Sequence, residues 1–184
     1  MSTALAAAVV ATTVRLLASH EYAEGAPAGF TGGFKEDTCS ACHFGSELNS
    51  GSGRLTIEGL PAKYSAGERY TLTVTLARTG MKRAGFQLAA RFKNDGAQAG
   101  TLAPGAGDTE RVGVERQDGV QYAGQNKAGT AAGASDTTRW TLEWTAPRGG
   151  GAVIFHVAAN AADGNERTDG DFVYAANVES APPP

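Results

Sequence analysis

From Arg54 onward the chain alternates between apolar and polar residues, with the period of two that a half-buried β-strand requires. In the run that begins at Tyr70, every second residue is apolar and the residues between are threonines. About seven or eight such runs, separated by glycine- and proline-containing turns, predict an all-β, immunoglobulin-like antiparallel β-sandwich over residues 54–180. The expected strands cover residues 55–57, 70–76, 86–92, 112–114, 120–122, 138–144, 152–162 and 172–178.

Two of these runs carry further information. Trp140 and Trp144 are four residues apart on one expected strand, so both should face the core. In the run 152–162, the face opposite the expected core residues is also apolar, except for His156. A water-facing surface should be polar, so we expect this face to be covered, either by a cofactor or by the irregular segment that precedes the strands.

That preceding segment, residues 20–53, is rich in glycine and small residues and shows no sustained period, which predicts irregular structure. Residues 1–19 are apolar and resemble a signal peptide or an N-terminal membrane anchor. No Lys or Arg precedes Ala4, and Arg15 interrupts the apolar run, so the resemblance is incomplete. Residues 181–184 are expected to form a short tail.

Composition limits the classes of function. A chain of 184 residues, 41% of them hydrophobic, suits one globular domain. The net charge of −3, without a basic patch, argues against nucleic-acid binding. The pattern of residues shows no set of catalytic groups, so we expect no enzymatic activity.

The chemistry of the chain is concentrated in the run Cys39-Ser40-Ala41-Cys42-His43. Two thiols three positions apart can each add to a haem vinyl group, and the histidine that follows can bind the iron as the proximal ligand. These are the only cysteines, and their flanks are rich in glycine. The motif therefore predicts one covalently attached haem c; a local disulfide, a metal site or a thioredoxin-like redox pair remain alternatives.

The sequence offers several candidates for the distal ligand of such a haem. His156 is the first choice, because it lies on an apolar strand face, although a lone histidine is more often a hydrogen-bonded structural residue. Met81 is the second choice, in a turn beside Gly80 and two cations, where a core methionine would be unusual. His20 or an open sixth position is the third. Asp163, Asp169 and Asp171 also suggest a calcium loop, although such loops are more often simply solvated.

These features predict a monohaem c-type cytochrome that transfers electrons, either free or as a subunit of a larger redox or photosynthetic complex. Since bacteria attach haem to thiols outside the cytoplasm, we expect a periplasmic or otherwise extracytoplasmic protein, secreted or membrane-anchored through residues 1–19. Its expected partner is a redox protein or a membrane redox complex. The alternatives are a non-enzymatic adhesion or scaffold module with a Cys39–Cys42 disulfide, and a haem-based binder of small ligands.

Several segments in order also resemble a known family. They are GAPAGFTGGFKEDTCSACHFG, AGFQLAARF, QYAGQNKAGT, RWTLEWTAP, FHVAANAADGN and GDFVYAANVES. Together they are similar to the bacterial Reeler-like family, also called choice-of-anchor V domain proteins, over Gly25 to Ser180. The resemblance implies an exported β-sandwich with an N-terminal haem-binding segment, which Cys39, Cys42 and His43 match. Some relatives carry a histidine in the third segment, where this chain has Gln125.

Overall fold

The computed structural model describes residues 25–133 and 136–183. Within them, nine strands and two short 3-10 helices, η1 (Cys39–Ala41) and η2 (Lys127–Thr130), follow one another along the chain. The strands are β1 (Arg54–Glu58), β2 (Arg69–Ala77), β3 (Arg83–Phe92), β4 (Thr101–Pro104), β5 (Val112–Gln117), β6 (Val120–Gln125), β7 (Thr137–Thr145), β8 (Val153–Ala162) and β9 (Phe172–Ser180).

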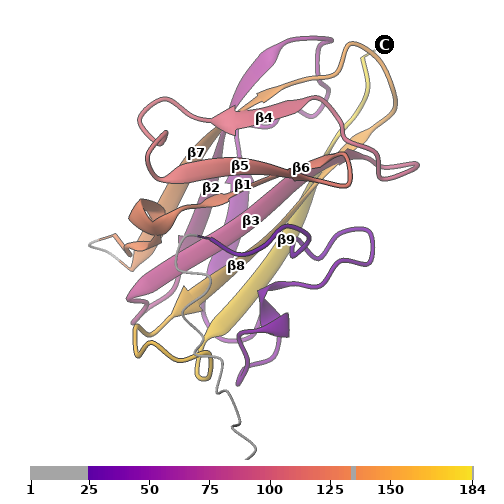
Figure 1. Ribbon diagram of the computed structural model, residues 1–184. Coiled ribbons are helices and arrows are strands. Elements are labelled where there is room, and N and C mark those ends of the chain that lie inside the picture. Colours follow the sequence, from indigo (N-terminus) through magenta and orange to yellow (C-terminus); the bar gives the residue numbers. More distant parts are fainter. Residues whose placement is uncertain (1–24, 134–135, 184) are drawn as a thin grey trace, which may run out of the picture.

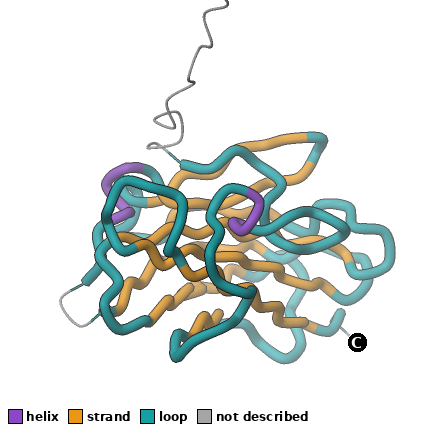
Figure 2. Tube along the Cα trace, turned by 90° about the horizontal axis from the view of Figure 1, so that it is seen from below, coloured by secondary structure: helices purple, strands orange, loops and turns teal. Residues whose placement is uncertain are grey.

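The strands form two antiparallel sheets that enclose one core (Figures 1 and 2). One sheet has four strands in the order β1-β2-β7-β4, and the other has five in the order β5-β6-β3-β8-β9. Side chains from both sheets contribute to the same buried cluster, in which the indoles of Trp140 and Trp144 are fully buried. The all-β sandwich and the inward placement of both tryptophans are confirmed.

The predicted strands correspond to observed ones because their alternation matches the burial of their side chains. Along β2, the apolar residues from Leu72 to Leu76 are buried and the threonines between them are not, which lets β2 pair with β7 over its whole length. The sequence did not predict β4, which is four residues long and ends in Pro104. It lies at the edge of its sheet, the position where a proline that cannot donate a hydrogen bond is tolerated.

The outer face of the five-stranded sheet is covered by the chain that precedes β1. Ala89 on β3 and Ala158 on β8 point away from the core, yet both are fully buried. Ala28 packs with Ala89, Val120 and Tyr122 in a second, smaller apolar cluster. In Figure 1 the indigo N-terminal segment passes in front of β3, β8 and β9. Over residues 25–53, the part of the predicted irregular segment that the structure describes, the only regular element is the single turn of η1.

The limits of the sandwich are set by β1, which begins at Arg54, and β9, which ends at Ser180. The first residue of the expected tail, Ala181, is hydrogen-bonded to the sandwich: its N–H donates to the carbonyl of Ala62, and its carbonyl accepts from the N–H of Tyr64. The expected signal peptide or anchor at residues 1–19, like His20, lies outside the described residues. Among the residues that are described, no helix is long and apolar enough to cross a membrane.

Candidate functional site

The cysteine motif forms a single turn of 3-10 helix. Thr38 precedes this turn and caps it, since its Oγ1 accepts a hydrogen bond from the backbone N–H of Ser40 at 3.2 Å. The backbone N–H of His43 donates to the carbonyl of Cys39 at 2.9 Å, which continues the turn to the histidine. No residue of η1 itself is fully buried, so the turn lies at the surface.

The two thiols of this turn are free and have different surroundings. Burial raises the pKa of the Cys39 thiol to about 12, which keeps it protonated at neutral pH. Cys42 is exposed to solvent. Cys42 is therefore the more accessible of the two thiols, and Cys39 is half-buried.

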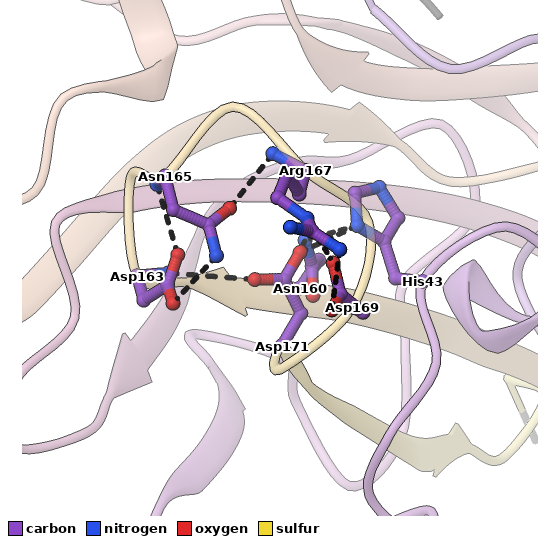
Figure 3. A network of polar contacts seen from close by, with 7 residues as sticks. All are labelled: His43, Asn160, Asp163, Asn165, Arg167, Asp169 and Asp171. Atoms are coloured by element: carbon purple, nitrogen blue, oxygen red, sulfur yellow. Dashed lines mark hydrogen bonds and ion pairs between the residues drawn. The ribbon is translucent and has the colours of Figure 1, made fainter.

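His43 is fixed by a buried carboxylate from the far end of the chain (Figure 3). Its Nδ1 lies 2.6 Å from Oδ2 of Asp171, whose side chain is fully buried. The amide nitrogen of Asn160 donates to the same Oδ2 at 3.0 Å and also lies 3.0 Å from the histidine Nδ1. Because a carboxylate oxygen can only accept, the 2.6 Å contact places a hydrogen on Nδ1, which donates it to Asp171, and the approach of the Asn160 amide to Nδ1 is then a contact between two donors and not a hydrogen bond. This tautomer leaves Nε2 with a free lone pair.

The chain after His43 is tied to the loop between β8 and β9. The backbone N–H of Phe44 donates to the carbonyl of Thr168 at 2.9 Å, and the N–H of Gly170 donates back to the carbonyl of Phe44 at 3.1 Å. Phe44 and Asp169 form an isolated parallel bridge. A surface cavity of about 340 Å³ opens beside Phe44 and is lined by loop residues 166–169.

The acidic residues of this loop do not converge on a cation site. Asp163 accepts hydrogen bonds from Asn165, Asp169 pairs with Arg167, and Asp171 accepts from His43. Within residues 25–133 and 136–183, no group of three or more His, Cys, Asp or Glu side chains is arranged to hold a metal ion. The calcium hypothesis therefore gains no support.

The surroundings of the motif are unusually apolar for a surface. Among the described residues, the exposed large hydrophobic side chains are Phe34 at 37%, Phe44 at 57% and Leu48 at 45% exposure, and all three flank the cysteine motif. An apolar ligand in contact with these side chains would remove them from water. These residues fit a haem, because His43 offers a proximal nitrogen, Cys42 an exposed thiol and Cys39 a half-buried one, beside apolar side chains.

His156, the first choice as distal ligand, lies on the outer face of β8, four residues before Asn160. The N-terminal segment covers it: a Cβ placed on Gly33 would lie 2.4 Å from its Cγ, and the Phe34 ring meets it edge-on at 5.4 Å. Its Nδ1 is buried without a hydrogen-bond partner. Burial lowers its pKa, so the ring is neutral at pH 7.

Met81, the second choice, is 2% exposed and packs in the core between the sheets. The expectation that a methionine in this turn would be an unusual core residue was wrong, because its backbone turns the side chain inward at the start of β3. Gln125 lies instead on the outer face, with its amide 3.0 Å from a Cβ placed on Gly85, the residue that pairs with Asn160. His156 and Gln125 thus share a face with His43, and Met81 does not.

Two residues of the site were missed as partners of His43. Asp171 was considered only for calcium, and Asn160 was not singled out. The alternation of β8 carries a signal for Asn160, because residues 156, 158 and 160 must face the same side of the strand. Nothing local relates Asp171 to a histidine 128 positions away.

Comparison with known proteins bears on the fold. No protein-family model matches the chain, and a search of curated proteins finds no match. Among solved structures, the reeler domain of human F-spondin is similar, with a TM-score of 0.52 and 21% identity over 76% of this chain and 94% of that one. The Reelin-N domain of F-spondin gives a TM-score of 0.53 at 21% identity over 79% and 96%. The chain is a two-sheet antiparallel sandwich that resembles the reeler domain.

The unequal burial of the thiols predicts unequal reactivity in the protein without haem. At pH 8, iodoacetamide should modify Cys42 about a hundredfold or more faster than Cys39, because the thiolate is the reactive form and a pKa near 12 leaves little of it at Cys39. Peptide mass spectrometry after timed quenching measures both rates. In denaturant the two rates should converge, and equal rates in the folded protein would show that Cys39 already faces solvent.

Proposed function

We propose that this protein is a monohaem c-type cytochrome, with haem c attached to Cys39 and Cys42 and His43 as its proximal ligand. The observation that carries the proposal is the contact between His43 Nδ1 and the buried carboxylate of Asp171 at 2.6 Å. Histidines that bind metals characteristically donate their second ring nitrogen to a carboxylate or carbonyl, which fixes the tautomer and makes the ligating nitrogen more basic. The contact with Asp171 supports His43 as an iron ligand, because it orients the ring and leaves Nε2 for the metal.

A bound haem would supply an iron that cycles between the ferric and ferrous states. The chain's own residues orient it: Asp171 fixes the His43 ring, and Asn160 holds the Asp171 carboxylate in place. The thiols tether the group, which lets an open surface site retain an apolar ligand. Phe34, Phe44 and Leu48 offer the apolar contacts that would otherwise face water.

Electron transfer outside the cytoplasm is the role that suits this site. The exposure of Cys42 and Phe44 would leave a haem edge accessible to a partner, either a soluble redox protein or a membrane redox complex of which the chain is a subunit. Covalent haem attachment implies export to the periplasm or beyond, with residues 1–19 as signal or anchor. We propose no enzymatic step, because the residues around His43 serve to orient it.

The competing proposal is an adhesion or scaffold module with a Cys39–Cys42 disulfide. A third is a haem-based binder of small ligands. The reeler-like sandwich is compatible with all three, since a fold by itself does not determine function. The state of the two sulfur atoms and of the sixth iron position separates them.

The deciding experiment is expression with the haem maturation machinery, followed by absorption spectroscopy and intact mass. We expect one covalent haem per chain, a reducible α-band, and loss of attachment when Cys39 and Cys42 are both replaced by alanine. A chain without haem and two mass units lighter than the reduced form would instead establish the disulfide. Rapid binding of CO or cyanide by the unaltered protein would favour the small-ligand binder.

The role of Asp171 predicts a shift in reduction potential. Asp171→Asn keeps the shape of the side chain but weakens acceptance from His43 Nδ1, so the ferric state loses stabilisation. A tenfold loss in the relative stability of the ferric state corresponds to a rise of about 60 mV in the one-electron reduction potential. Redox titration measures it, with Asp169→Asn, an equal change of charge two residues away at a side chain paired with Arg167, as the control. Equal shifts in both variants would assign the effect to charge alone.

The distal ligand is tested by two alanine variants. We expect His156→Ala to convert ferric iron from low to high spin and Met81→Ala to leave it low spin, because His156 shares the outer face with His43 and Met81 lies in the core. Absorption and electron paramagnetic resonance spectra distinguish the states. The opposite result would assign Met81, and an unchanged spectrum in both variants would exclude both residues.

A further inference from the structure

A partly buried carboxylate, that of Glu36, joins the N-terminal segment to the sheet. The side chains of Glu36 and Arg91 are 14% and 16% exposed, and Arg91 Nη1 lies 2.6 Å from Glu36 Oε1. The hydroxyl of Tyr122 donates to the same oxygen at 2.6 Å, and the hydroxyl of Thr31 donates to Oε2. One carboxylate therefore accepts three hydrogen bonds, one of them from a cation.

The donors come from separate parts of the chain. Arg91 belongs to β3 and Tyr122 to β6, whereas Thr31 belongs to the same segment as Glu36. Burial and the neighbouring Glu36 raise the pKa of Tyr122, so its hydroxyl keeps the proton that it donates. A buried charge that loses its partner is strongly disfavoured. The contact therefore ties the segment to two strands of the sandwich.

The same pair determines how the segment covers His156. The Arg91 guanidinium lies 4.5 Å from the centre of the Phe34 ring, and the same ring packs edge-on against His156 with the two ring centres 5.4 Å apart. The loop that contains Phe34 is closed by two backbone hydrogen bonds of 2.9 Å, from Gly32 to Asp37 and from Glu36 to Gly33. Glu36 is also only three residues before Cys39.

We infer that Glu36 and Arg91 are positioning residues for the haem site: their ion pair holds residues 31–43 on the outer sheet face and so sets where His43 lies relative to His156. The inference rests on the proposed cytochrome function as far as the iron is concerned. The docking of the segment does not depend on haem, and the two are measured separately.

The first measurement uses the protein without haem. Glu36→Gln preserves the shape of the side chain but leaves Arg91 with a neutral partner. Hydrogen exchange of the amides of Gly32 and Glu36 should become at least about tenfold faster. The exchange rates of the amides in β2 and β7 should stay unchanged, and so should the fluorescence of the core tryptophans. Asp37→Asn is the matched control, because it neutralises an adjacent exposed carboxylate. Uniformly faster exchange, or the same rates in both variants, would overturn the inference.

The second measurement uses the haem-loaded protein. Glu36→Gln should increase the proportion of high-spin ferric iron, which a residue that only stabilises the sandwich would not change, and Asp37→Asn should match the unaltered protein. An unchanged spectrum in Glu36→Gln would overturn the positioning role. If Glu36→Gln does not fold, Tyr122→Phe removes one donor from the same oxygen and should show both effects in weaker form. An unaltered protein that takes up no haem refutes the cytochrome proposal, whereas the exchange rates still decide whether Glu36 positions the segment.

Discussion

The outer face of the five-stranded sheet cannot be left in water, and this constraint places the whole candidate site. Ala89 and Ala158 on this face are fully buried, and the amide of Gln87 is 3% exposed. Gln87 finds both of its hydrogen-bond partners in the irregular segment, since Oε1 accepts from the N–H of Phe30 at 2.7 Å and Nε2 donates to the carbonyl of Pro27 at 2.8 Å. Because a buried amide without partners is costly, the segment is an integral part of the fold.

Strand β8 and the N-terminal segment that covers it contribute different groups to the candidate site. β8 presents His156 and Asn160 on one face with a spacing fixed by its pleat, and the start of β9 is preceded by the buried Asp171. The segment contributes the thiols and His43, whose positions depend on side-chain contacts. Groups that must be held rigidly lie on the sheet, and groups that must react lie on the covering chain, a division common in functional sites.

This division explains what the sequence could predict. Alternation is a local property, so the strands, the inward tryptophans and the covered face around His156 were all predictable. The four residues of β4 were too few to show alternation, and the inward turn of Met81 depends on how β3 enters the core. The motif itself identified His43, but not Asp171, because a contact between residues 128 positions apart leaves no local pattern.

The residues on either side of the cysteine motif are anchored to the sandwich, whereas the turn that carries the thiols makes few contacts with it. On one side, Glu36 is hydrogen-bonded to Arg91 and Tyr122; on the other, Phe44 forms a backbone bridge to the loop after β8. Between these anchors, no residue of η1 is fully buried, so the thiol-bearing turn can rearrange without disturbing the core. Haem attachment at the half-buried Cys39 would use such a rearrangement. The fixed ends limit how far it extends, and therefore His43 can keep its contact with Asp171 while the cysteines react.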